Sequence, residues 1–230
     1  MKGFRICRIF GIDIEIDFSL LIIFGLIVWQ LSAAFSWLGA VAGAVLFIFS
    51  IVFHEMAHSL TARRFNITVR KITLWMFGGI AQTEQKDGFG SPKAEFLISI
   101  AGPFSSIFLA GMFFFLAGGA VASSKLAASV LIWLFYINVI LVVFNLIPLF
   151  PMDGGRILRS LIWWKTKNLI KATRITRDTA IVFAVLLPIA GFFWGGWFSV
   201  LWLGFIAWRI LIPAVFAEYK MISGGKNDRS

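Results

Sequence analysis

Long apolar stretches alternate with short polar or charged links along this chain. Each stretch is close to the roughly 20 residues that an α-helix needs to cross the hydrocarbon core of a bilayer. The pattern therefore predicts an all-α polytopic membrane protein with about six transmembrane helices. Gly195 and Gly196 allow only a very tight turn between the last two expected helices. The expected spans cover residues 18–34, 37–60, 95–121, 127–150, 179–195 and 197–216.

Two segments have a different periodicity and predict short membrane-associated β-strands. Within residues 6–18, isoleucine alternates with Asp or Glu, which is the period-two pattern of a strand. Residues 67–83 are rich in β-branched and aromatic residues and are interrupted by Gly78 and Gly79. Neither segment is long enough, or free enough of charge, to be another span. We therefore expect strands near the N-terminus and after the second helix.

The composition supports a membrane protein and excludes two other classes. Hydrophobic residues make up 60% of the chain and charged residues 14%, with a mean hydropathy of +0.90. A soluble domain has about 25% charged residues, so an ordinary soluble enzyme is excluded. Intrinsic disorder is excluded because it requires low hydrophobicity. Cys7 is the single cysteine, so an intramolecular disulfide framework is excluded as well.

The net charge of +10 is best explained by membrane topology. With six spans and both termini inside, every Lys and Arg except Lys125 falls on the cytoplasmic side, as the positive-inside rule requires. We therefore expect a multi-pass protein of the cell membrane with cytoplasmic N- and C-termini. The lipid bilayer is an expected partner, and nucleic acid is not. Residues 1–221 are expected to form one transmembrane domain, followed by a frayed tail at 222–230.

A candidate metal motif, His54-Glu-Met-Ala-His58, lies at the end of the second expected span. Residues four apart share one face of a helix, so the two imidazoles can bind one Zn²⁺ at about 2.0–2.1 Å each. Glu55 can then take a proton from water at the metal. An ionisable group at membrane depth costs about 2.5–3.5 kcal/mol on insertion scales, which favours a functional role. An accidental motif with solvated histidines is the alternative.

A zinc site of this type needs a third protein ligand, and Asp153 is the strongest candidate. It follows Pro148 and Pro151 and precedes two glycines at the end of the fourth expected span. Proline cannot continue a helix, and glycine adopts backbone angles that other residues avoid. The helix is therefore expected to unwind and let Asp153 turn towards the histidines. In the alternative, these residues only end the span and Asp153 is a carboxylate of a cytoplasmic loop.

Together, His54-Glu-Met-Ala-His58 and Asn145-Leu-Ile-Pro-Leu-Phe-Pro-Met-Asp153-Gly resemble the motifs of the site-2 protease family of intramembrane zinc metalloproteases. The resemblance extends over most of the chain, including Gly78-Gly79 and Ala101-Gly102-Pro103, and is strongest with the prokaryotic six-span group. It implies that His54, His58 and Asp153 bind zinc and that Glu55 is the catalytic acid and base. It also implies that Asn145 contacts the substrate or the developing oxyanion, whereas a helix–helix hydrogen bond is its alternative role.

The implied activity is hydrolysis of peptide bonds within or near transmembrane segments of membrane-protein substrates, that is, regulated intramembrane proteolysis. A transmembrane helix must unwind before its peptide bonds can be cut, and an exposed β-edge could bind the extended peptide. We expect residues 72–82 to provide this edge, with Gly78 and Gly79 allowing close backbone approach. In the alternative, this segment is re-entrant and purely structural.

Other functions remain open at this point. They are an inactive relative that binds membrane helices, a zinc transporter or sensor, and a membrane-embedded H-E-x-x-H protease of another family. Intact Glu55 argues against the first, and the single cluster of potential ligands argues against transport. Many members of the resembling group add a nucleotide-binding regulatory domain after the last span, and we expect that domain to be missing or removed here. The substrate and the oligomeric state are not indicated by the sequence.

Overall fold

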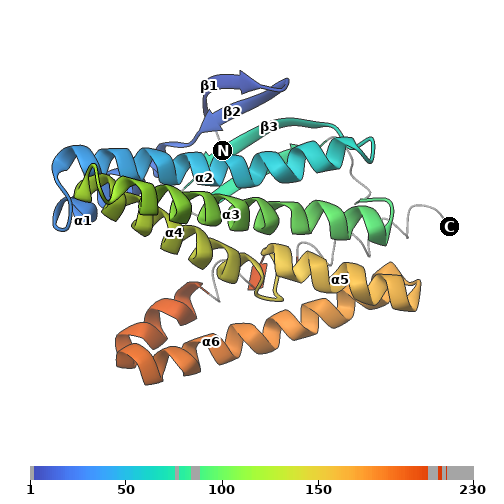
Figure 1. Cartoon of the computed structure of the whole chain (residues 1–230). Helices are drawn as coiled ribbons and strands as arrows, with labels where there is room; N and C mark the ends of the chain where they lie inside the picture. Colours follow the sequence, from blue (N-terminus) through green and yellow to red (C-terminus); the bar gives the residue numbers. More distant parts are fainter. Residues whose placement is uncertain (1–2, 76–77, 84–88, 207–211, 214–215, 217–230) are drawn as a thin grey trace. The chain divides into compact units, whose positions relative to one another are not determined.

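The computed structural model of the chain describes residues 3–75, 78–83, 89–206, 212–213 and 216 (Figure 1). Helices predominate, and the strands are short and lie in the first part of the chain. In chain order the elements are β1 (Phe4–Ile9), β2 (Ile12–Ile16), α1 (Phe18–Ser32), α2 (Trp37–Arg63), β3 (Val69–Trp75), β4 (Gly78–Thr83), α3 (Pro92–Ala120), α4 (Lys125–Asn145), α5 (Asp153–Thr166) and α6 (Leu169–Ile206).

The helical membrane fold with a few short strands is confirmed. Within the described residues, four helices are long and apolar enough to cross a membrane, namely α2, α3, α4 and the part of α6 over Leu169–Phe193. Helix α1 is apolar as well but has only 15 residues. The number of membrane helices agrees only approximately with the six expected spans. Helix α1 is shorter than a span, and α6 covers the positions of two expected spans.

The C-terminal half differs from the expected pattern in three places. The fourth span was expected to reach residue 150, but α4 ends at Asn145. The basic link that follows contains a helix, α5, which was not expected because the charged residues of this segment exclude a membrane span. The fifth and sixth expected spans fall on one assigned helix, α6, although Gly196 has a φ of +64° and the orange ribbon turns back near its end (Figure 1). Part of the expected sixth span, and the tail at 222–230, lie outside the described residues.

Most helices begin at a polar side chain that satisfies a free backbone amide. Such caps replace the hydrogen bonds that the first turn of a helix cannot make, and each contributes about 1 kcal/mol. They also explain why each of these helices begins at a defined residue, although a run of apolar residues does not by itself mark where a helix starts. The capping residues are Asp17 for α1, Ser36 for α2, Ser91 for α3, Ser124 for α4 and Asn168 for α6.

The strands form one sheet in the order β1-β2-β3-β4. Strands β1 and β2 are antiparallel and are joined at Phe10 and Gly11, whose φ values of 49° and 75° are those of a type I′ hairpin turn. Strands β2 and β3 are parallel, and β3 and β4 are antiparallel. Strand β3 is therefore an interior strand, so the expected free edge over residues 72–82 is wrong for residues 72–75. Within the described sheet, that edge belongs to β4.

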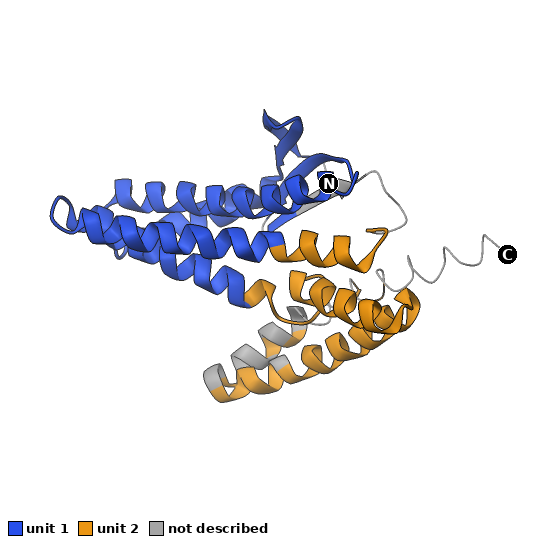
Figure 2. Ribbon diagram, turned by 45° about the vertical axis from the view of Figure 1, so that its right-hand side comes forward, with its two compact units in different colours: residues 1–86, 101–143 blue, residues 87–100, 144–230 orange. Residues whose placement is uncertain are grey.

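The chain divides into two compact units, coloured separately in Figure 2. Unit 1 comprises residues 1–86 and 101–143, and unit 2 comprises residues 87–100 and 144–230. In unit 1, Leu109 and Phe113 of α3 pack against Val130 and Leu134 of α4. In unit 2, Leu149 and Phe150 pack against two alanines of α6, Ala180 and Ala184.

A buried polar link crosses the helices of unit 1. The side-chain amide of Asn138 on α4 donates hydrogen bonds to Ser50 Oγ on α2 at 3.1 Å and to the Leu134 carbonyl at 2.8 Å. Both Asn138 and Ser50 are fully buried. Such interhelical hydrogen bonds in membranes contribute about 0.6–2 kcal/mol. This link fixes α2 one helical turn before His54.

An ion pair joins the two parallel strands of the sheet. Lys71 Nζ on β3 donates to Glu15 Oε2 on β2 at 2.9 Å, and Thr73 Oγ1 donates to the same oxygen at 3.2 Å. The Lys71 hydrogen bond is the main reason why the pKa of Glu15 lies below its ordinary value, and the Thr73 hydrogen bond lowers it further. Ionised Glu15 therefore stabilises the sheet.

This arrangement predicts a pH-dependent effect of Lys71→Met. Because the pKa of Glu15 is lowered in the folded state, its stabilising contribution is present above the ordinary glutamate pKa and is lost as the pH falls through the folded-state pKa. Thermal unfolding followed across pH should show Lys71→Met less stable than the parent at neutral pH, with the difference shrinking in acid. Lys125→Met, at the start of α4, is the control. A difference that persists unchanged at acid pH would contradict the role assigned to Glu15.

Candidate metal centre

The two histidines of the H-E-x-x-H motif lie on one face of α2, as their spacing predicts. His54 Nε2 and His58 Nε2 are 3.1 Å apart, and the two rings are nearly perpendicular. His54 is buried and His58 is half-buried. Two ring nitrogens at this separation can bind a single ion between them, because each Zn–N bond is about 2.0–2.1 Å long.

Ser106 on α3 orients the first of these rings. Its Oγ lies 2.9 Å from His54 Nδ1, and both side chains are buried. When Nε2 is the ligating nitrogen, Nδ1 carries the proton and donates it to Ser106 Oγ. Histidines that bind metals almost always donate their second ring N–H to such a partner, which fixes both the tautomer and the ring orientation.

Gly102, one turn earlier on α3, provides the space in front of both imidazoles. A Cβ atom at this position would lie 2.2 Å from His58 Nε2 and 2.6 Å from His54 Nε2. Real Cβ contacts essentially never come so close. Because the missing methyl group faces the two nitrogens that would bind the ion, the residues of unit 1 fit a metal at this point.

Gly79 on β4 lies against the catalytic candidate Glu55. A Cβ atom at Gly79 would be 2.4 Å from Glu55 Cγ and 2.7 Å from Cδ, so the strand backbone reaches the carboxyl-bearing end of this side chain. The neighbouring Gly78 has a φ of +129°, which other residues rarely adopt. The structure thus brings Gly79 to Glu55 within unit 1, whereas a Cβ at Gly78 would meet nothing within 4 Å.

Asn145 and Asp153 flank a non-helical segment of unit 2. Asn145 is the last residue of α4, Asp153 is the first residue of α5, and residues 146–152 between them contain neither helix nor strand. This break is the one expected from the paired prolines. The two glycines after Asp153 are required by the packing, because a Cβ at Gly154 would lie 2.3 Å from the Leu146 carbonyl oxygen.

Two of the three predicted ligands, His54 and His58, lie together on α2 within unit 1. Asp153, the third predicted ligand, is the first residue of α5. Two imidazoles and one carboxylate are typical ligands of a catalytic zinc ion, which keeps its fourth position for water or substrate. Asp153 belongs to unit 2, so its ligation is taken up below as a proposal.

Two residues of α3 have roles that the sequence did not reveal. Gly102 and Ser106 were assigned no chemistry from the sequence, whereas the structure places both against the imidazoles. They are four residues apart, as are His54 and His58. Two small residues at this spacing on an apolar helix were the available signal, but packing between membrane helices gives the same pattern.

Substitution of Gly102 tests this arrangement directly. Gly102→Ala should displace both imidazoles and abolish retention of a divalent metal, because the added methyl group has no space beside the Nε2 atoms. Gly111→Ala on the same helix is a matched control, since a Cβ there meets nothing within 4 Å. The measurement is metal content after purification, with thermal unfolding as a check on folding. Equal metal content in both variants would contradict the proposed site.

Comparisons with known proteins bear on this site. Rip3 of Mycobacterium tuberculosis, named as a candidate zinc metalloprotease, is 35% identical over 224 residues, covering 90% of this chain and 56% of Rip3. The zinc metalloprotease MJ0392 of Methanocaldococcus jannaschii is 32% identical, covering 81% of this chain and 53% of MJ0392. The chain thus spans little more than half the length of these relatives.

A solved structure and a family model agree with these relatives. The structure of the site-2 protease from Methanocaldococcus jannaschii is 27% identical, with a TM-score of 0.63 and 95% of each chain covered. The model of peptidase family M50 matches residues 42–122 and 117–189, which include all the candidate metal ligands. The chain therefore belongs to peptidase family M50.

Proposed function

We propose that this chain is an intramembrane zinc metalloprotease that hydrolyses peptide bonds within or near transmembrane segments of membrane-protein substrates. The observation that carries the proposal is the pair of imidazoles on the apolar helix α2. Their Nε2 atoms are 3.1 Å apart, Gly102 has no side chain to displace them, and Glu55 lies between them in sequence. Membership of family M50 and the names of the relatives support the same chemistry.

His54, His58 and Asp153 would hold the zinc ion. Bound zinc supplies a Lewis acid for the scissile carbonyl and lowers the pKa of a water ligand to about 7. Ser106 keeps the His54 ring in the ligating orientation by accepting the hydrogen bond from Nδ1. The break after α4 supports the role of Asp153, because an Asp at the first turn of α5 follows backbone that is free of helical constraints.

Glu55 acts as general base and then as general acid. It accepts a proton from the attacking water and later delivers that proton to the nitrogen of the leaving amine. A positioned carboxylate typically contributes 10²–10⁴-fold to the rate of such a step. The backbone of β4 at Gly79 limits where the Glu55 side chain can lie, which favours a fixed orientation of its carboxylate.

Asn145 donates a hydrogen bond to the oxyanion that develops on the scissile carbonyl. Its place at the end of α4, beside the non-helical segment that leads to Asp153, supports this role. Losing one such donor typically costs about 2.7–4 kcal/mol of transition-state stabilisation.

The unwound substrate binds along β4. An edge strand presents unpaired N–H and C=O groups to which an extended peptide can add. The position of Gly79 against Glu55 would place the scissile bond near the catalytic carboxylate. Gly78 and Gly79, without side chains, allow the peptide backbone to approach closely.

The distribution of basic residues supports cytoplasmic N- and C-termini. His54, His58 and the end of α2 then lie towards the cytoplasmic face, so cleavage would release a cytosolic product from a transmembrane protein substrate. The lipid bilayer is the environment of the reaction. A purely binding function is less well supported, because it gives no reason for Glu55 to accompany the two histidines.

Glu55→Gln and Asp153→Asn separate the catalytic base from the metal ligand. With a co-expressed membrane substrate, Glu55→Gln should abolish cleavage and keep its zinc, because the amide cannot accept the water proton. Asp153→Asn should lower both zinc content and cleavage, because a neutral amide is a weaker ligand. Substrate immunoblots and metal analysis provide the readouts. Cleavage at the parental level in both variants would exclude the protease.

Asn145→Ala tests the oxyanion contact. We expect kcat to fall about 10²–10³-fold while zinc content stays at the parental level, since the contact strengthens only in the transition state. Single-turnover cleavage in detergent or nanodiscs measures this change. A fall in substrate affinity with unchanged kcat would instead assign Asn145 to substrate binding.

A further inference from the structure

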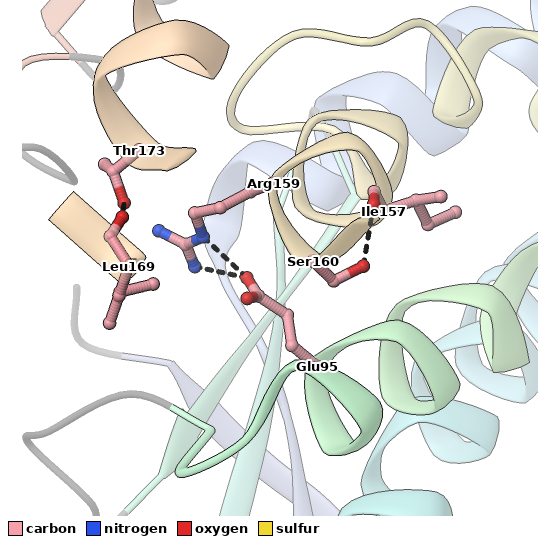
Figure 3. A network of polar contacts seen from close by, with 6 residues as sticks. All are labelled: Glu95, Ile157, Arg159, Ser160, Leu169 and Thr173. Atoms are coloured by element: carbon pink, nitrogen blue, oxygen red, sulfur yellow. Dashed lines mark hydrogen bonds and ion pairs between the residues drawn. The ribbon is translucent and has the colours of Figure 1, made fainter. Parts of the chain in front are cut away.

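An ion pair between Glu95 and Arg159 is buried inside unit 2 (Figure 3). Arg159 Nε on α5 donates to Glu95 Oε1 on α3 at 2.7 Å, and Arg159 Nη2 donates to the same oxygen. Glu95 is 1% exposed and Arg159 is 2% exposed. The pair is therefore almost completely removed from both water and lipid.

Stability alone is a weak reason for such a pair. Removing two charges from water costs several kcal/mol per ion, and apolar residues of similar volume are often equally stable or more stable. A buried pair does have one property that apolar contacts lack, because its strength depends on a narrow geometry. It can therefore fix the position of one helix against another.

Arg159 also contacts the segment that leads to Asp153. Its guanidinium lies 5.0 Å from the centre of the Phe150 ring, which is within the range of a cation–π interaction. Phe150 is fully buried, belongs to residues 146–152 and packs with Leu149 against α6. Glu95 thus holds Arg159, and Arg159, itself on α5, contacts the Phe150 side chain three residues before Asp153.

We propose that Glu95 and Arg159 are positioning residues that fix the Asp153 carboxylate for metal binding. This inference rests on the proposed function, in which Asp153 is the third zinc ligand. Neither residue touches substrate or metal. Their effect passes through Phe150 and the start of α5.

Glu95→Gln in the full chain, purified in nanodiscs, tests the proposal. Chelator competition should show an apparent zinc affinity about ten-fold or more below the parent, the range found when residues supporting a ligand are lost. In the metal-free protein, amide hydrogen exchange over residues 146–152 should be faster. Asp178→Asn is the matched control, because it removes the exposed ion pair with Arg177 on α6 in the same unit. It should leave both measurements unchanged.

The double variant Glu95→Leu with Arg159→Met keeps the test decisive if Glu95→Gln fails to fold. It leaves no unpaired buried charge, so its unfolding temperature should be near that of the parent. Its zinc affinity should nevertheless stay reduced and its exchange over 146–152 stay raised. Parental zinc affinity and exchange in this variant, or in folded Glu95→Gln, would overturn the proposal. If the parent itself retains no zinc, the proposed function fails, and hydrogen exchange still reports on the ion pair.

Discussion

Two imidazole nitrogens 3.1 Å apart on an apolar helix are the constraint on which the rest of this protein depends. A polar side chain in the apolar part of a membrane needs a hydrogen-bond partner within the protein, because lipid tails cannot supply one. Ser106 gives His54 such a partner, and Asn138 and Ser50 connect the neighbouring helices one turn away. The apolar remainder of α2, α3 and α4 holds this small polar cluster together.

Close approach without side chains is the second requirement of the site. Gly102 faces both imidazoles, Gly79 faces Glu55, and Gly154 lies under the Leu146 carbonyl. At each of these positions a single methyl group would collide with a functional side chain or with its supporting backbone. These glycines act through the volume they leave empty, so the site is shaped by backbone as much as by ligands.

The sequence predicted the features that have a local signature. Apolar runs located the main helices, and the spacing of His54 and His58 placed both rings on one face. Alternation located the N-terminal strands, and β-branched and aromatic residues located the strands after the second helix. It could not show that β3 is an interior strand, because strand order is set by tertiary pairing. Helix α5 was concealed by its charges, and Arg159 looked like an ordinary basic residue of a cytoplasmic link. Gly102 and Ser106 were ambiguous because packing helices and supporting a ligand require the same small residues.

The parallel pairing of β2 with β3 has a consequence for biosynthesis. Two helices, α1 and α2, intervene in the chain between these neighbouring strands. Such distant contacts form only after the intervening loop has been closed, which is slow compared with local structure. The sheet can therefore be completed only once both helices are in place. A half-made chain carries the H-E-x-x-H residues without β4 beside Glu55, so a nascent copy lacks its proposed peptide-binding edge until β4 has been synthesised.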